Sequence, residues 1–297
     1  MCIVFLSPNF PPNYGNFCLR LKEEGARVCG IGDCDFSVLP PELRAALDWY
    51  CQVDSLYNYN DVRDAFAYLE YRFGPVARVE SLNEAWLETE ARLRTDFKIA
   101  GCGSDGILQV RRKSLMKEVF AAAGIDSARW EIARSVESAL AFAGRVGYPV
   151  IIKPDAGVGA DDTHKLNTAG EIRDFHGFRS GREYIIEEFV RGGIVTFDGL
   201  AGASGEPVFY TSHVYQQAPM DALHGQQDVF YYCVREVPPD ICRAGLKLLE
   251  GFGITNGFFH FEFFRREDGG LSAMEINARP PGGMTLDMFN YSADMDC

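Results

Sequence analysis

The 297-residue sequence lacks three features that would each place it in a familiar class of protein. No apolar run approaches the roughly 18–20 residues of a membrane-spanning helix, so no membrane partner is expected. Lys and Arg number only 29 against 42 Asp and Glu, and the net charge of −13 argues against a nucleic-acid partner. The nine cysteines form no Cys-x-x-Cys pair, so neither a zinc site nor a disulfide framework is expected.

The first residues do not have the pattern of a leader segment. Met1 to Leu6 is a short apolar run without basic residues before it, and Ser7-Pro8 ends it, so no secretory signal is expected. Scattered, unpaired cysteines are typical of a reducing compartment. We therefore expect a cytoplasmic protein. Its hydrophobic content of 47% and charged content of 24% are ordinary for a globular chain with two or three lobes.

The first third of the sequence alternates strand and helix patterns. Strands are predicted at 2–6, 26–31 and 76–81, and helices at 17–24, 62–71 and 82–95. Such a β-α-β alternation predicts an α/β fold with a parallel sheet and helices on its faces. We assign it to an N-terminal domain, 1–109.

The rest of the chain mixes longer helices with strands in sequence-adjacent pairs. Helices are predicted at 110–123, 137–146 and 241–252, and a last helix begins after Gly283. Strands are predicted at 148–154, 184–190, 196–200, 208–215 and 229–237. The chain ends soon afterwards, and the sequence leaves open whether it is complete.

The most informative stretch is a predicted hairpin formed by 260–264 and 274–277 around an Asp-Gly-Gly turn. Period-2 alternation puts Glu262, Glu275 and Asn277 on one face of adjacent strands. Two carboxylates and an amide oxygen suit Mg²⁺, with Mn²⁺ as an alternative. A solvated strand face would explain Glu262 alone. The complete set, followed by Arg279 and a Pro-Pro-Gly-Gly loop, favours a metal site that works with phosphate.

Two other segments are compatible with a nucleotide but ambiguous by themselves. Lys153 ends an apolar strand and precedes a loop with Gly157 and Gly159, which could cradle phosphate or could be an ordinary turn beside a surface lysine. The strand end formed by residues 187–190 could present backbone groups to adenine, or it could simply finish at the surface.

Taken in this order, these motifs resemble those of the ATP-grasp superfamily of carboxylate–amine ligases, over roughly residues 110–283. The resemblance implies an α+β ATP-grasp region with antiparallel sheets, divided into a small lobe (110–190) and a large lobe (191–297). It implies ATP phosphate contacts from Lys113 and Lys153 and a mobile lid containing Gly157 and Gly159. It also implies an adenine pocket formed by Glu187, Glu188, Phe189 and Val190. It implies a Mg²⁺ site formed by Glu262, Glu275 and Asn277. The catalytic residues would be Arg279 and Lys153.

The sequence also departs from the family pattern. Gly192-Gly193-Ile194 stands where many such ligases have an acidic residue for the ribose hydroxyls. The lid has Asp161-Asp162 where a serine is common, which indicates either a cationic amine substrate or, as we favour, an outward-facing loop.

The resemblance implies an ATP-dependent enzyme that joins a small-molecule carboxylate to an amine and releases ADP and phosphate. Two alternatives stay open, a bicarbonate-using, carboxylase-like member and an ATP-binding regulatory protein that has lost catalysis. A homodimer is compatible with the sequence but not required by it.

Overall fold

The structure, a computed structural model, describes residues 1–157, 162–216 and 230–293. Residue contacts divide the chain into two compact units, Met1–Ile107 and Leu108–Asp296. The boundary falls within helix α5 (Ser104–Arg111). The division of the second unit into lobes at residue 190 remains a prediction. Within the described residues, no helix is both long and apolar enough to cross a membrane.

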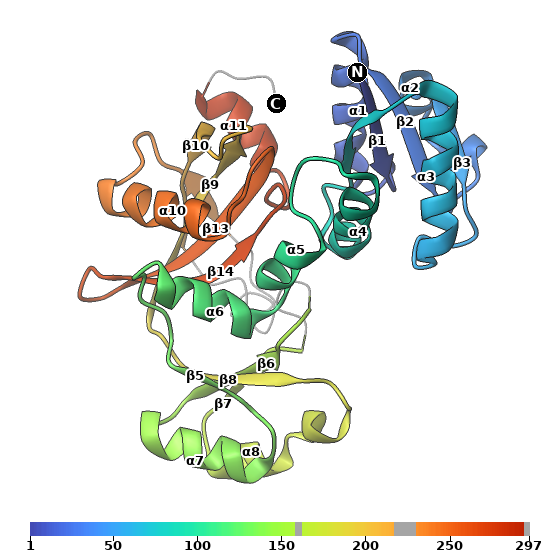
Figure 1. Cartoon of the computed structure of the whole chain (residues 1–297). Helices are drawn as coiled ribbons and strands as arrows, with labels where there is room; N and C mark the ends of the chain where they lie inside the picture. The colour runs from blue at the N-terminus through green and yellow to red at the C-terminus, as the bar shows by residue number, and fades with distance from the viewer. Residues whose placement is uncertain (158–161, 217–229, 294–297) are drawn as a thin grey trace. The chain divides into compact units, whose positions relative to one another are not determined.

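The first unit contains a four-stranded, all-parallel sheet in the order β3-β2-β1-β4 (Figure 1). Its strands are β1 (Cys2–Leu6), β2 (Arg27–Gly32), β3 (Trp49–Gln52) and β4 (Val76–Glu80). The helices are α1 (Gly15–Glu23), α2 (Pro41–Ala46), α3 (Tyr59–Phe73) and α4 (Leu87–Phe97), with 3₁₀ turns η1 (Pro12–Tyr14), η2 (Phe36–Val38) and η3 (Glu84–Trp86).

This unit has its own hydrophobic core. Every residue of β1 is buried, as expected for a parallel strand covered on both faces. Phe66 and Leu69 of α3 pack with Val4 and Leu6 of β1, because the 3.6-residue period places them on one stripe of the helix. The predicted α/β fold is therefore confirmed.

The second unit begins with α6 (Lys113–Ala122) and a four-stranded antiparallel sheet in the order β5-β8-β6-β7. Its elements are β5 (Trp130–Ile132), α7 (Val136–Val146), β6 (Val150–Pro154), β7 (His164–Leu166), α8 (Ala169–Asp174), η4 (His176–Arg179) and β8 (Tyr184–Glu188). One face packs on α7 and α8, through Val150, Ile152 and Phe142 among others (Figure 1). The alternate residues of β6 and β8 face the other way.

A six-stranded antiparallel sheet forms the rest of this unit, in the order β12-β11-β9-β13-β14, with β10 paired to β9. Its elements are β9 (Gly192–Ala201), β10 (Pro207–Thr211), β11 (His213–Tyr215), β12 (Tyr231–Cys233), α10 (Pro239–Gly251), β13 (Gly257–Arg266), β14 (Leu271–Asn277) and α11 (Thr285–Ala293). Phe259, Phe261 and Phe263 are fully buried on one face of β13. The opposite, polar face has His260 and Glu262 at its centre, flanked by Phe258 and Phe264.

Three boundaries differ from the sequence prediction for identifiable reasons. The expected helix 110–123 is broken at Arg112, because the buried Asp155 accepts from the Ser114 backbone N–H (2.7 Å) and so caps the start of α6. The expected strand 208–215 keeps one register against β9 but is interrupted at Ser212, since the His213 backbone N–H donates to the Thr196 hydroxyl (3.0 Å). The expected helix 82–95 begins later, as η3 and α4, because Leu82 has a φ of 55°.

Candidate active site

The second unit contains an open cavity of about 690 Å³. One wall is the face of β6 and β8 turned away from α7 and α8, with Ile151, Lys153 and Glu187. Another wall is the polar face of β13 and β14, with Glu262 and Glu275 among its residues. Strand periodicity produces both walls, because alternate residues of each strand point to opposite faces.

The cavity brings together most of the residues singled out from the sequence. Those that line it are Lys113, Lys153, Glu187, Glu188, Phe189, Val190, Glu262, Glu275, Asn277 and Arg279. Gly157 is not among the lining residues, and Gly159 and Asp161 lie outside the described part of the chain. Their roles in ligand binding remain predictions.

Two carboxylates face each other across the β13–β14 hairpin. Glu262 pairs directly with Glu275, and the neighbouring pair is His260 with Asn277. Like charges directly opposite on paired strands repel, so the arrangement favours a cation between them. Lys113 supplies part of that charge, with its Nζ 3.4 Å from Glu275 Oε1.

This donor set fits a divalent cation bound together with phosphate. Within the described residues, no three His, Cys, Asp or Glu side chains gather as a ready-made metal site. The hairpin instead offers two carboxylates, Glu262 and Glu275, and the Asn277 amide oxygen. A cation bound there would take its remaining ligands from phosphate oxygens and water. Mg²⁺ is commonly bound in this way, by one or two carboxylates and substrate phosphates.

A buried charge cluster lies at the β6–β8 wall. Glu187 Oε2 is 2.8 Å from Lys153 Nζ, and Glu187 Oε1 is 3.0 Å from Lys117 Nζ. Burial acts to raise the pKa of Glu187, but the two lysine charges outweigh it and lower that pKa to about 2. Burial opposes the charge of Lys153, whose pKa is nevertheless raised by Glu187 and Glu275. The neighbouring carboxylates thus favour the charged form of Lys153 beside an anionic ligand, whereas burial lowers the pKa of Lys117.

The end of β8 lies at the cavity, which Phe189 and Val190 line. Strand pairing stops at Glu188, and among the described residues the backbone groups of Phe189 and Val190 form no hydrogen bond to other backbone groups. The Glu188 carboxylate points elsewhere, into an ion pair with Arg129 (2.6 Å). Lys165 lies over the Phe189 ring, with Nζ 4.2 Å from the ring centroid. The strand end can therefore hydrogen-bond a planar ligand edge through its backbone.

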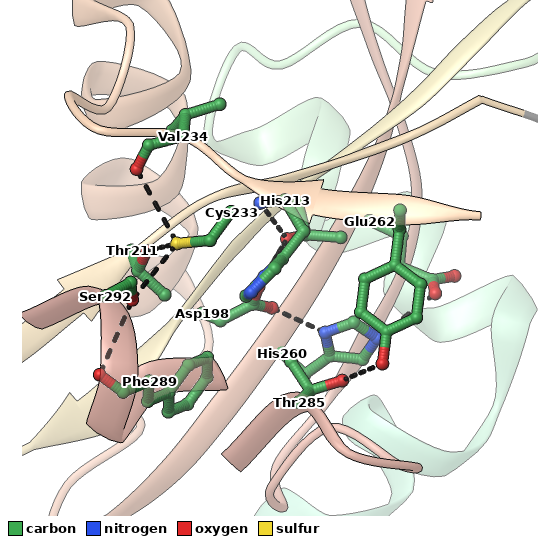
Figure 2. A network of polar contacts seen from close by, with 12 residues as sticks. Asp198, Thr211, His213, Cys233, Val234, His260, Glu262, Thr285, Phe289 and Ser292 are labelled. Atoms are coloured by element: carbon green, nitrogen blue, oxygen red, sulfur yellow. Dashed lines mark hydrogen bonds and ion pairs between the residues drawn. The ribbon is translucent and has the colours of Figure 1, made fainter. Parts of the chain in front are cut away.

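A second polar network lies beneath the hairpin, and sequence reasoning missed its central residue, Asp198 (Figure 2). Asp198 Oδ1 is 2.5 Å from His260 Nδ1, and Asp198 Oδ2 is 2.8 Å from His213 Nδ1. His260 Nε2 is 3.1 Å from Glu262 Oε1. Burial opposes protonation of His260, but the two carboxylates outweigh it and raise its pKa to about 10. The alternation in Thr196-Phe197-Asp198 was the available signal.

Asp162 and Gly192, the two departures from the family pattern that the structure describes, have identifiable positions, and so does the polar residue Arg235. Asp162 accepts from Tyr184 Oη (2.5 Å) and contacts His164 Nε2 (2.8 Å), so it fastens its loop to the small sheet. Gly192, in place of the ribose acid, lines the cavity where β9 meets β13; a Cβ there would lie 2.4 Å from the Arg265 carbonyl oxygen. Arg235 is exposed and does not line the cavity.

Comparison with known proteins agrees with this geometry. Residues 146–287 match the model of the ATP-grasp domain, and residues 111–178 match the carbamoyl-phosphate synthase L chain ATP-binding domain. The L-arginine-specific L-amino acid ligase of Bacillus subtilis is 28% identical over 244 residues, which are 77% of this chain and 59% of that protein. The chain thus spans little more than half the length of this relative.

Solved structures share the fold. The L-amino acid ligase of Bacillus licheniformis has a TM-score of 0.75 at 16% identity, covering 96% of this chain and 68% of that one. The biotin carboxylase domain of the Hydrogenobacter thermophilus 2-oxoglutarate carboxylase also scores 0.75, at 18% identity and with 99% and 70% coverage. The match of residues 146–287 to the ATP-grasp domain model, together with the sequence relative, identifies an ATP-grasp domain in this chain.

Proposed function

We propose that the protein is an ATP-dependent ligase that activates a small carboxylate as an acyl-phosphate and joins it to an amine. The observation that carries this proposal is that cationic side chains and a facing carboxylate pair line one cavity, namely Lys113, Lys153, Arg279, Glu262 and Glu275. A site for a neutral ligand would not need both sets. A triphosphate with a divalent cation needs both.

The nucleotide base is assigned to the β8 end. Its edge would hydrogen-bond the backbone groups of Phe189 and Val190, and its faces would contact apolar lining residues such as Ile151 and Met274. Glu187 would keep Lys153 in place rather than bind the base, because both its oxygens already face lysines.

The phosphates are assigned to the space between Lys153, Lys113 and Arg279. Lysine offers a compact charge, and arginine can donate two parallel hydrogen bonds to phosphate oxygens. Glu262, Glu275 and Asn277 would hold Mg²⁺, which when bound neutralises phosphate charge and orients the terminal phosphoryl group. Mn²⁺ is the alternative ion for the same oxygen donors.

The chemistry then follows from positioning and charge neutralisation. A carboxylate oxygen of the first substrate attacks the γ-phosphorus, the bond to the β–γ bridging oxygen breaks, and ADP leaves. The amine nitrogen attacks the acyl carbon, the carbon–oxygen bond to phosphate breaks, and the nitrogen loses a proton. Arg279 would stabilise the transferring phosphoryl group. The sequence relative, named as an amino acid ligase, supports this reaction class.

ADP release from Mg-ATP, measured with amino acids and other small carboxylic acids singly and in pairs, tests the proposal. We expect release that requires both an acid and an amine, with the amide product seen by mass spectrometry. Arg279→Ala should lower kcat by about 10²–10³-fold while changing nucleotide affinity far less. The control Arg235→Ala, at an exposed site, should match the wild type.

Two outcomes would contradict the ligase, and a third would contradict only the role of Arg279. Bicarbonate-dependent release without an amine would indicate the carboxylase-like alternative. Tight Mg-ATP binding with no release for any pair would indicate a non-catalytic nucleotide-binding protein. Full turnover by Arg279→Ala would remove the role assigned to this residue.

A further inference from the structure

The polar face of the six-stranded sheet is arranged in two rows that cross β9, β13 and β14. One row is Asp198–His260–Asn277, and the other is Thr196–Glu262–Glu275. The first row thus places a fully buried carboxylate beside His260, on the side away from Asn277. His260 also contacts Glu262 in the second row, so it links the buried carboxylate to the facing pair.

The hydrogen bonds define what His260 does. Its Nδ1 faces Asp198 Oδ1 at 2.5 Å and its Nε2 faces Glu262 Oε1 at 3.1 Å. Ionised carboxylates only accept hydrogen bonds, so each ring nitrogen that satisfies its carboxylate partner donates to it. Such a ring fixes Glu262 through one oxygen and leaves the other oxygen for a ligand.

Asp198 is built into this arrangement rather than exposed to solvent. Its second oxygen, Oδ2, is 2.8 Å from His213 Nδ1 and also accepts from the Thr196 hydroxyl. A buried carboxylate with several donors is held rigidly, because leaving it unpaired would be costly. Figure 2 shows Asp198 between the two histidine rings.

We propose that Asp198 is a positioning residue that acts through His260 to hold Glu262 ready for the divalent cation. The inference rests on the proposed function, because it assumes that Glu262 binds the cation that accompanies the nucleotide. It assigns Asp198 no contact with substrate. Residues that orient metal ligands commonly change metal affinity by 10–100-fold when they are replaced.

The test measures Mn²⁺ binding by electron paramagnetic resonance in the presence of ADP, together with ADP affinity in EDTA. Asp198→Ala should weaken Mn²⁺ binding at least about tenfold and leave metal-free ADP affinity within about twofold. His260→Leu should have a similar effect. Because Asp198 acts through His260, Asp198→Ala should add little in the His260→Leu background.

His213→Asn is the matched control, because the Asn side-chain amide can still donate to the other oxygen of Asp198 in place of His213 Nδ1. Among the contacts of the described residues, His213 makes no hydrogen bond or ion pair with Glu262. The Mn²⁺ affinity of this variant should stay within about twofold of the wild type. If Asp198→Ala does not fold, the equal-sized Asp198→Asn replaces it in the same cycle. It should weaken Mn²⁺ binding in the same direction but less, since a neutral amide oxygen is a weaker hydrogen-bond acceptor than a carboxylate oxygen.

Three results would overturn the inference while leaving the ligase proposal intact. The Mn²⁺ affinity could be unchanged after substitution of Asp198, it could fall equally in the wild-type and His260→Leu backgrounds, or it could fall as much in His213→Asn as in Asp198→Ala. Failure of the wild-type protein to bind Mn²⁺ with ADP would overturn the nucleotide–metal site, and with it both proposals.

Discussion

Glu187 shows how a single buried charge can prepare a binding site. It lies between Lys117 and Lys153 in a wall of the cavity, and all three side chains are buried. Removing one partner of a buried ion pair is costly because the other charge is left uncompensated. The extra lysine, Lys117, offsets Glu187, so that the charge of Lys153 remains available to an anionic ligand.

The same cluster predicts how stability depends on pH. The pKa of Glu187 is about 2 in the folded protein against an ordinary value of 4.5, so its contribution is present above the ordinary value and is lost as pH falls towards 2. From about pH 5.5 to about pH 3.5 the wild type should lose about 1 kcal/mol more unfolding free energy than Glu187→Gln. Urea unfolding at several pH values measures how the unfolding free energy of each protein, wild type and Glu187→Gln, changes with pH. Parallel slopes would contradict the assignment.

For single residues, the sequence predicted which side chains belong to the site but not which side chains they contact. Glu262, Glu275 and Asn277 could be placed on one face because a hairpin fixes its own register. Glu187 was expected near adenine, and its two lysine partners were not foreseen, since Lys117 is far away in the chain. Asp198 was missed for the same reason. Its partners, His213 and His260, lie on the strands that pair with β9, and the sequence alone does not give that pairing.

The packing of helix α10 on the six-stranded sheet depends on Gly245, which has no side chain. A Cβ at Gly245 would lie 2.2 Å from Cδ1 of Phe197, which is fully buried in β9. Neither partner can withdraw easily, because Phe197 also stacks on Phe259 with ring centroids 5.3 Å apart. The helix can therefore approach the sheet closely only with glycine at this position.

Gly245→Ala should consequently destabilise the protein by about 1–3 kcal/mol, the usual cost of overpacking a core. Gly144→Ala in α7 is the matched control, since Gly144 is exposed and nothing lies within 4 Å of a Cβ built there. This control should stabilise by about 0.5–1 kcal/mol through helix propensity. Denaturant unfolding of both variants measures the difference. Equal effects in the two helices would contradict the packing argument.

The longer elements could be predicted because their periodicity extends over enough residues. Strand β1 has the range expected for it, and helix α3 and strands β13 and β14 contain their expected ranges but begin about three residues earlier. Strands β5 and β7, with three residues each, were not predicted. A strand of this length carries no measurable period and is defined by the neighbours with which it pairs.

The whole chain consists of two units with separate cores, and every residue that lines the described cavity belongs to the second. A ligand that binds only the folded form of one unit stabilises that unit by mass action. The first unit has no share in the described cavity. Nucleotide binding should therefore change the stability of the two units unequally.

Hydrogen exchange followed by mass spectrometry, with and without MgADP, tests this expectation by measuring amide exchange rates in peptides from each unit. At about 100 times its dissociation constant, the ligand should stabilise the second unit by about 2.7 kcal/mol and slow exchange in β6, β8, β13 and β14. Peptides from β1 to β4 should exchange at unchanged rates. EDTA with ADP is the control, and it should give less protection in the β13–β14 hairpin than MgADP, because Glu262 and Glu275 then have no cation between them. Protection of β1 to β4 equal to that of β13 would show that the units unfold as one, and would contradict the independence of their cores.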